Sequence, residues 1–423
     1  MKHLSVLNTL IPPISLRPED TVENAIAIES LQNEIQSLDN EVDRGLDMAL
    51  ALEELSTIID KIQILKPSHQ AMIYVAGNLA TAGTNIDADN VIPSMESDDG
   101  GSKESMVAKL KANAIAIVKM IKEFVAQVWE SFKKLLNQLT IQASLTNQKA
   151  KDYEDRIRKV RTKSIDAFIT RPVIFEGKPV TDIQEMVQLA IKAGSLDKEY
   201  SKFIETIEHT FIKTSNALAN YVKGATSGQN PCEELVSGLD FKKNLAFFGG
   251  YEIKLPDVDV ETELFSSTAR VVIGDQLKRV CRAIRLQVIA PEAVDALDHQ
   301  VMSPSELLEL IKAFKEINAS LSPTNASGLP ITIKRAERTI KMVQDVLENA
   351  LKETPSQLNS SNSIKDEEKF DVGLYAIRSA VPTFIAMTSH LLSTFNSTLL
   401  RNNALLSGRL SGVIEGNLKA YGV

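Results

Sequence analysis

The sequence predicts a mainly α-helical protein, with long amphipathic helices, a helical bundle and a minor β-hairpin or small-sheet element in the middle. Apolar residues recur at steps of three and four over long stretches near both ends of the chain, which is the period of one helical face. Aromatic residues make up only 5% of the chain, whereas sandwiches and barrels are richer in aromatic and β-branched side chains. Hydrophobic residues make up 43%, enough for a core.

Residues 1–96 predict an acidic helical leader. They hold 15 Asp or Glu and 5 Lys or Arg, whereas the rest of the chain holds 40 and 42. Asp20 and Glu23 have the spacing of a capping box, and the amphipathic pattern that follows predicts a helix ending near Pro67. Residues 82–102 are rich in Gly, Asp, Asn and Ser, so we expect an exposed flexible linker there.

Residues 97–143 predict a basic amphipathic helix in which Phe124, Trp129 and Phe132 lie among lysines. Three interpretations stay open. The apolar stripe faces an ordinary core while the lysines are solvated; the lysines contact a nucleic-acid backbone without reading its sequence; or residues 105–139 lie on a membrane surface. The lysines concerned are Lys103, Lys109, Lys111, Lys119, Lys122, Lys133 and Lys134.

Residues 144–300 predict a mixed helical region with small β-hairpins, and residues 301–423 a C-terminal helical bundle. The second hairpin has a Gly249-Gly250 pair at its turn, a strong hairpin signal. The expected elements are hairpins at 173–180 and 245–255, a strand at 269–273, and helices at 182–193, 197–222, 291–298, 304–321, 334–351 and 365–420.

Motifs of known enzymes are missing from the sequence, which therefore predicts a non-enzymatic protein without cofactor or metal. Glu205, Glu208 and His209 form an E-x-x-E-H pattern, a weak indication of a metal site because no further ligand is indicated. Cys232 and Cys281 are expected to be buried thiols. No apolar stretch has the length of a membrane span, so we expect a soluble protein. Motifs do not report a catalytic site assembled from distant residues.

An acidic helical leader containing Ala51-Leu52-Glu53-Glu54-Leu55, a short helix, a Gly/Asp linker and a lysine-rich helix follow one another. This order resembles the precursors of internal head proteins in giant myovirus-type bacteriophages, most strongly over residues 20–140. The resemblance implies a structural protein assembled in the host cytoplasm and packaged with DNA inside the capsid of the virion. It also implies capsid and scaffold proteins and the head-maturation protease as partners. Ejection into the host stays open, and the alternative is a membrane-active protein using helix 105–139.

The resemblance further implies removal of the leader by a protease that cuts after Glu in a small-residue–x–Glu pattern. Four glutamates besides Glu96 match this pattern, but two lie within the predicted leader helix and one follows a stiffening proline. Glu96 lies in the linker, where the charge character changes, and Glu104 is the nearest rival. We therefore expect cleavage between Glu96 and Ser97. The expected site residues are Ser94, Met95, Glu96 and Ser97, and the other matches are Glu29, Glu53, Glu104 and Glu292.

The opposite charges of the leader and the basic helix predict one further contact. We expect the leader to fold back across the linker and cover the lysines electrostatically until it is removed.

Overall fold

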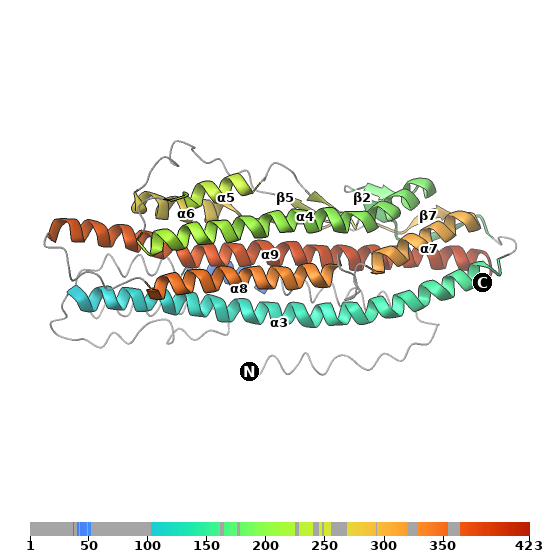
Figure 1. The fold of residues 1–423 in the computed structure, drawn as a ribbon. Helices are drawn as coiled ribbons and strands as arrows, with labels where there is room; N and C mark the ends of the chain where they lie inside the picture. The colour runs from blue at the N-terminus through green and yellow to red at the C-terminus, as the bar shows by residue number, and fades with distance from the viewer. Residues whose placement is uncertain are drawn as a thin grey trace.

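The computed structural model shows an elongated bundle in which long helices run side by side, with short strands along one side (Figure 1). The mainly α-helical prediction is confirmed. The structure describes residues 37, 40, 41, 43–48, 50, 51 and 103–423, except 161–164, 176–177, 225–227, 240–244, 248, 255–268, 293, 320–327 and 354–363.

The longest helix, α9 (Ile364–Ala420), runs through the middle of the bundle (Figure 1). Between residues 376 and 404, both apolar and polar side chains of α9 itself are buried. This is expected for a helix that is covered on every side. Its buried polar groups bond back to carbonyls one turn earlier. Thr388 Oγ1 donates to the Phe384 carbonyl at 2.9 Å, and Asn396 Nδ2 to the Leu392 carbonyl at 2.6 Å. These bonds reduce the desolvation cost of a polar central helix.

Among the described helices, five pack against α9 and a sixth, α5, packs on α4 and α6; their apolar residues form two clusters with those of α9. The larger cluster joins α9 to α3, α4, α6 and α8, while the smaller joins its C-terminal part to α7 and the ends of α3 and α4. These helices are α3 (Lys103–Ile157), α4 (Ile183–Val222), α5 (Pro231–Gly238), α6 (Arg270–Ala283), α7 (Pro304–Ala319) and α8 (Leu329–Glu353).

Three small antiparallel sheets lie against the helices. They pair β1 (Ala167–Thr170) with β7 (Leu297–Gln300), β2 (Val173–Phe175) with β3 (Lys178–Val180), and β5 (Glu252–Lys254) with both β4 (Leu245–Ala246) and β6 (Gln287–Ile289).

Asparagines of α9 hold backbone outside the helix. Gly249, in the turn between β4 and β5, donates its N–H to Asn402 Oδ1 at 2.6 Å, and Gly250 follows at φ +94°. Asn417 Oδ1 accepts the N–H of Met302 at 2.7 Å, just before α7 begins. The central helix therefore positions one sheet and the start of one helix through side-chain amides.

Both predicted hairpins are confirmed, but two expected elements were wrong. The expected strand at 269–273 is the start of α6, because Ile273, Leu277 and Cys281 fall on one helical face that is buried. The expected helix at 291–298 does not form. Its last residues begin β7, where His299 is buried and its ring stacks on Phe168 of β1 at 5.9 Å between centroids.

Three further boundaries differ from the expected ones. The helices expected at 182–193 and 197–222 are one helix, α4. The expected boundary after residue 143 lies inside α3, and the regions on either side of residue 300 share both apolar clusters. The whole of the expected linker at 82–102 lies outside the described residues, which resume at residue 103 with the start of α3.

Candidate functional site

The apolar face of the predicted basic helix belongs to the core. On α3, Val125, Val128, Trp129 and Phe132 are each at most 7% exposed, and the two rings stack with centroids 5.0 Å apart. This matches the interpretation of an ordinary core-facing stripe. The membrane-active alternative is not supported, because these described side chains already pack against the other helices. Among the described helices, none has an apolar stretch long enough to cross a bilayer.

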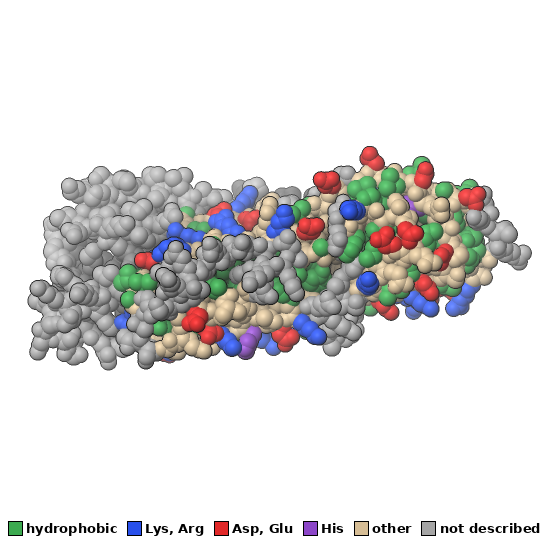
Figure 2. All heavy atoms as spheres, turned by 90° about the horizontal axis from the view of Figure 1, so that it is seen from above, with side chains coloured by type: hydrophobic (Ala, Val, Ile, Leu, Met, Phe, Trp, Pro, Cys, Tyr) green, Lys and Arg blue, Asp and Glu red, His purple; other side chains and the backbone are tan. Residues whose placement is uncertain are grey.

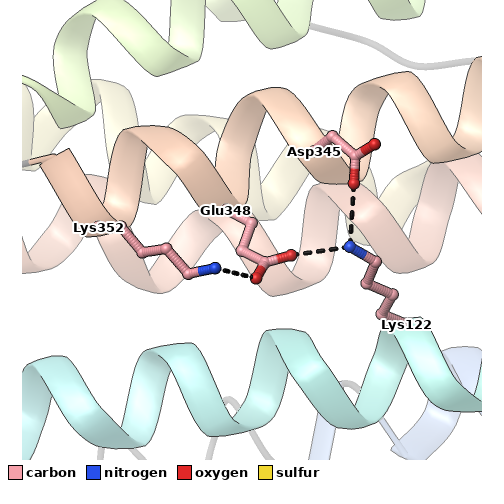
Figure 3. A network of polar contacts seen from close by, with 4 residues as sticks. All are labelled: Lys122, Asp345, Glu348 and Lys352. Atoms are coloured by element: carbon pink, nitrogen blue, oxygen red, sulfur yellow. Dashed lines mark hydrogen bonds and ion pairs between the residues drawn. The ribbon is translucent and has the colours of Figure 1, made fainter.

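Two of the predicted contact lysines join α3 to α8. Lys122 Nζ lies 2.9 Å from an oxygen of Asp345 and 2.8 Å from one of Glu348, and Glu348 also pairs with Lys352 (Figure 3). The hydrogen bonds to Glu348 and Asp345 raise the pKa of Lys122, and the bond from Lys122 lowers the pKa of Glu348. Lys122 is therefore a structural cation that holds α3 against α8.

Lys133, eleven residues further along α3, also pairs with a carboxylate of α8. Its Nζ lies 2.7 Å from Glu337 of α8 and 2.9 Å from Glu130 of its own helix. Hydrogen bonds to these carboxylates raise the pKa of Lys133. All three long-range partners of these two lysines, Asp345, Glu348 and Glu337, come from α8, and none comes from the described leader residues.

The other predicted lysines have different surroundings. Lys134 is exposed, and Lys119 is exposed with Glu123 at 3.9 Å, one helical turn away. Lys103, Lys109 and Lys111 lie on α3, but their side chains lie outside the described residues. Figure 2 shows the opposite, sheet-bearing face, where acidic and basic side chains of the described residues are interspersed. That face presents no continuous basic track in its described part.

The described leader residues between 40 and 51, here called the leader segment, are helical and pack against α3 and α9. Leu46 and Met48 are 3% and 2% exposed and join the larger apolar cluster. Gly45 faces the ring of Phe124 on α3, where a Cβ would lie 2.0 Å from the ring atom Cε1. A larger residue at this position would collide with the ring and would force the Phe124 side chain or the leader segment to move.

Two leader carboxylates lie beside cationic or titratable groups of the bundle. Arg285, which follows α6, donates from Nη2 to Asp47 Oδ1 at 2.8 Å. Asp43 Oδ1 lies 3.4 Å from Nδ1 of His390, a residue of α9 that is 4% exposed. The described leader residues thus contact the bundle through their own apolar side chains and through the pairing of Asp47 with Arg285. From the sequence we had expected contacts with the lysines of α3 instead.

The residues that carry the expected cleavage, Ser94, Met95, Glu96 and Ser97, lie outside the described residues. Processing therefore stays a prediction.

The E-x-x-E-H pattern lies on α4. Glu208 is buried and lies 2.7 Å from Nε of Arg335 on α8, while His209 is exposed. Burial raises the pKa of Glu208 to about 7, against the opposing effect of Arg335. Within the described part of the chain, no group of three or more His, Cys, Asp or Glu side chains is placed to hold a metal ion.

The two cysteines are buried free thiols. Burial raises the pKa of Cys232 to about 12, which makes its thiolate scarce at neutral pH. Cys232 Sγ donates to the carbonyl of Ile273 at 3.6 Å, a packing role between α5 and α6.

The groove occupied by the leader segment is a feature that sequence motifs missed. Gly45, Phe124 and His390 belong to three segments that only the folded chain brings together. The isolated glycine in an otherwise helical leader pattern was the one signal available, since an internal glycine often marks a close contact.

Comparison with known proteins places the chain in a family. No curated protein and no solved structure matches it. A family model for phiKZ-like phage internal head proteins matches residues 23–277, which is more than half of the chain and includes both leader and bundle residues. Internal head proteins are structural components inside the phage head. The chain belongs to the phiKZ-like phage internal head proteins.

Proposed function

We propose that this chain is the precursor of a non-catalytic structural protein, packaged with DNA in the phage head and cut after Glu96 during head maturation. The family match carries this proposal, because it begins at residue 23 and so includes the acidic leader together with the bundle. The leader segment occupies its own position on the bundle, as expected for a precursor that folds before it is cut. Partners in assembly would be the capsid and scaffold proteins and the head-maturation protease.

Contact with DNA would be made through phosphates and would be independent of base sequence. Lys134 and Lys119 are exposed on α3 and suit this role. Lys122 and Lys133 suit it less well, because carboxylates of α8 already occupy their ammonium groups. The predicted contribution of Lys103, Lys109 and Lys111 remains part of the proposal. Ejection with the DNA is a separate possibility, which comparison of full and emptied particles addresses.

The intact mass of the protein from mature particles tests the processing step. We expect a chain that starts at Ser97. A Glu96→Gln variant should stay full-length in particles, because the protease requires a carboxylate at the residue before the cut. The matched control, Glu104→Gln, alters the nearest rival site and should be cut normally. A full-length wild-type chain in mature particles would contradict the proposal, and a start at Ser105 would move the cut to Glu104.

A further inference from the structure

The leader segment does not fill the groove that it occupies. A small cavity remains between Gly45 and Leu46 of the leader, Phe124 and Val128 of α3, and His390 of α9. Atoms that line a cavity lack contact partners on one side and lose the corresponding dispersion energy. The packing under the leader segment is therefore looser than that of a filled protein interior.

Few leader side chains take part in the contact. Among the described leader residues, Gly45, Leu46 and Met48 are buried and Leu50 is partly buried, while the larger apolar cluster is otherwise built from the bundle. The ion pair between Asp47 and Arg285 joins side chains that are 64% and 50% exposed, and such pairs contribute only some tenths of a kcal/mol. The bundle therefore supplies most of the apolar cluster, and the leader segment adds only a small share of it.

His390 is the polar group beneath the leader segment. Neither ring nitrogen has a hydrogen-bond partner among the described residues, and the Asp43 carboxylate at 3.4 Å is an ion-pair partner only for a protonated ring. The charged groups that act on this place are Asp43 and Asp47 of the leader, Arg285 after α6 and Arg401 of α9. Burial, with Arg285 adding to it, lowers the pKa of His390 to about 4, so the ring is neutral at pH 7.

We propose that the leader segment is a detachable plug of the groove between α3 and α9, and that acid promotes its departure by protonating His390 in the open groove. Gly45 helps to fix where the plug sits, because a side chain at this position would collide with the Phe124 ring as it lies here. The plug keeps an apolar stripe of α3 and an unsatisfied imidazole away from water. This inference concerns the uncut chain and stands whether or not the chain is cleaved after Glu96.

The direction of the pH dependence follows from where the proton binds. In the plugged groove the pKa of His390 is about 4, and exposure to water in the open groove returns it towards the ordinary value of 6.5. Docking is therefore strongest above pH 6.5 and weakens as the pH falls, by up to about tenfold per pH unit for one proton. Burial raises the pKa of Glu41 and of Asp43 in the docked leader. Those shifts favour docking in acid over windows that extend upward from 4.5 and 3.8, so they oppose the His390 effect in the lower part of its range.

Thiol labelling of the full-length chain tests the plug. Ser389 lines the cavity and is 7% exposed, and both native cysteines are buried, so Ser389→Cys adds one reporter inside the groove. Ser379→Cys is the matched control on the same helix, because Ser379 is 6% exposed and bonds to the Ala376 carbonyl away from the cavity. A dithiodipyridine reagent, which reacts in acid, measures both rates relative to the unfolded chain at each pH.

We expect the Ser389→Cys reporter to react faster, relative to the Ser379→Cys control, as the pH falls from 7.5 to 5. Addition of Gly45→Gln should give fast labelling already at pH 7.5, whereas Gly228→Gln, at a glycine with no atom within 4 Å of its Cβ position, should change nothing. His390→Gln should remove the rise of Ser389→Cys labelling in acid. Slow Ser389→Cys labelling in the Gly45→Gln chain would overturn the plug. A parallel rise at both reporters would also overturn it, since that reports loosening of the whole bundle.

Discussion

Lys122 of α3 and Glu348 of α8 form an ion pair of 2.8 Å between residues 226 positions apart in the chain (Figure 3). The same ammonium group also contacts Asp345. A lysine that the sequence offered as a contact for DNA or lipid is thus part of the helix packing. The two roles can be told apart by experiment. Loss of a structural lysine lowers stability, whereas loss of a phosphate-binding lysine lowers the salt dependence of DNA binding.

We predict that Lys122→Met lowers the free energy of unfolding by up to about 1 kcal/mol, since its partners are partly exposed and solvent screens the pair. Lys134→Met should leave stability unchanged, because Lys134 is exposed. In DNA binding over a salt series the order should reverse: Lys134→Met lowers the slope by about one counterion, and Lys122→Met leaves it unchanged. Urea denaturation and the salt series separate the two roles. If both variants changed the salt-dependence slope equally, Lys122 would have to be a DNA contact as well.

Gly274 permits the close approach of α6 to α9, and we predict that Gly274→Ala destabilises the bundle. A Cβ at this position would lie 2.4 Å from the carbonyl oxygen of Ala376, which is backbone and cannot rotate away. Helix propensity alone favours alanine over glycine by about 1 kcal/mol, so the contact must reverse the sign. We expect a net loss of about 1–3 kcal/mol. Gly228→Ala should stay within about 0.5 kcal/mol, and a stabilised Gly274→Ala chain would show that α6 shifts freely.

Asn402 positions the turn at Gly249, so Asn402→Ala should cost about 1–3 kcal/mol by leaving a buried N–H without an acceptor. Asn403 provides the control one residue later, because it is equally buried at 6% but its Nδ2 has no hydrogen-bond partner among the residues that the structure describes. Asn403→Ala should therefore cost clearly less. Thermal or urea unfolding of both variants measures the difference. Similar losses would mean that the hydrogen bond to Gly249 contributes little beyond side-chain packing.

The long helices were predictable because their apolar period is local information. The β4–β5 hairpin was predictable because Gly249-Gly250 marks its turn. The run Val271-Val272-Ile273 misled because β-branched residues favour strands, while burial against α9 decides that this segment is helical. β7 was missed because only its pairing with β1 makes residues such as His299 extended.

The candidate site could be predicted only in part. Composition was enough to indicate the acidic leader and the lysine-rich helix. Neither composition nor periodicity shows that Lys122 pairs with α8, or that Gly45 lies against the ring of Phe124. Such pairings depend on how distant helices cross, which no local pattern encodes.

We predict a pH dependence of the folding stability that comes from Glu208 of α4 and does not involve the leader segment. Its carboxyl is buried beside Arg335, and burial raises its pKa from 4.5 to about 7 in the folded chain. Between these values the folded state holds a proton that the unfolded state releases. Lowering the pH from 7 to 4.5 therefore stabilises the fold through this group, and raising the pH above 7 removes that contribution.

The measurement compares wild type with Glu208→Gln, which cannot ionise, by urea denaturation from pH 8 to pH 5. Subtracting the two curves cancels the other titrating groups, including His390. As the pH falls from 8 to 5, the free energy of unfolding of the wild type should rise by about 1–3 kcal/mol relative to that of the variant. The slope should be at most about 1.4 kcal/mol per pH unit. Parallel curves would mean that Arg335 keeps Glu208 ionised throughout. A wild type that loses ground in acid would mean that the pairing with Arg335 outweighs burial and that the pKa is lowered.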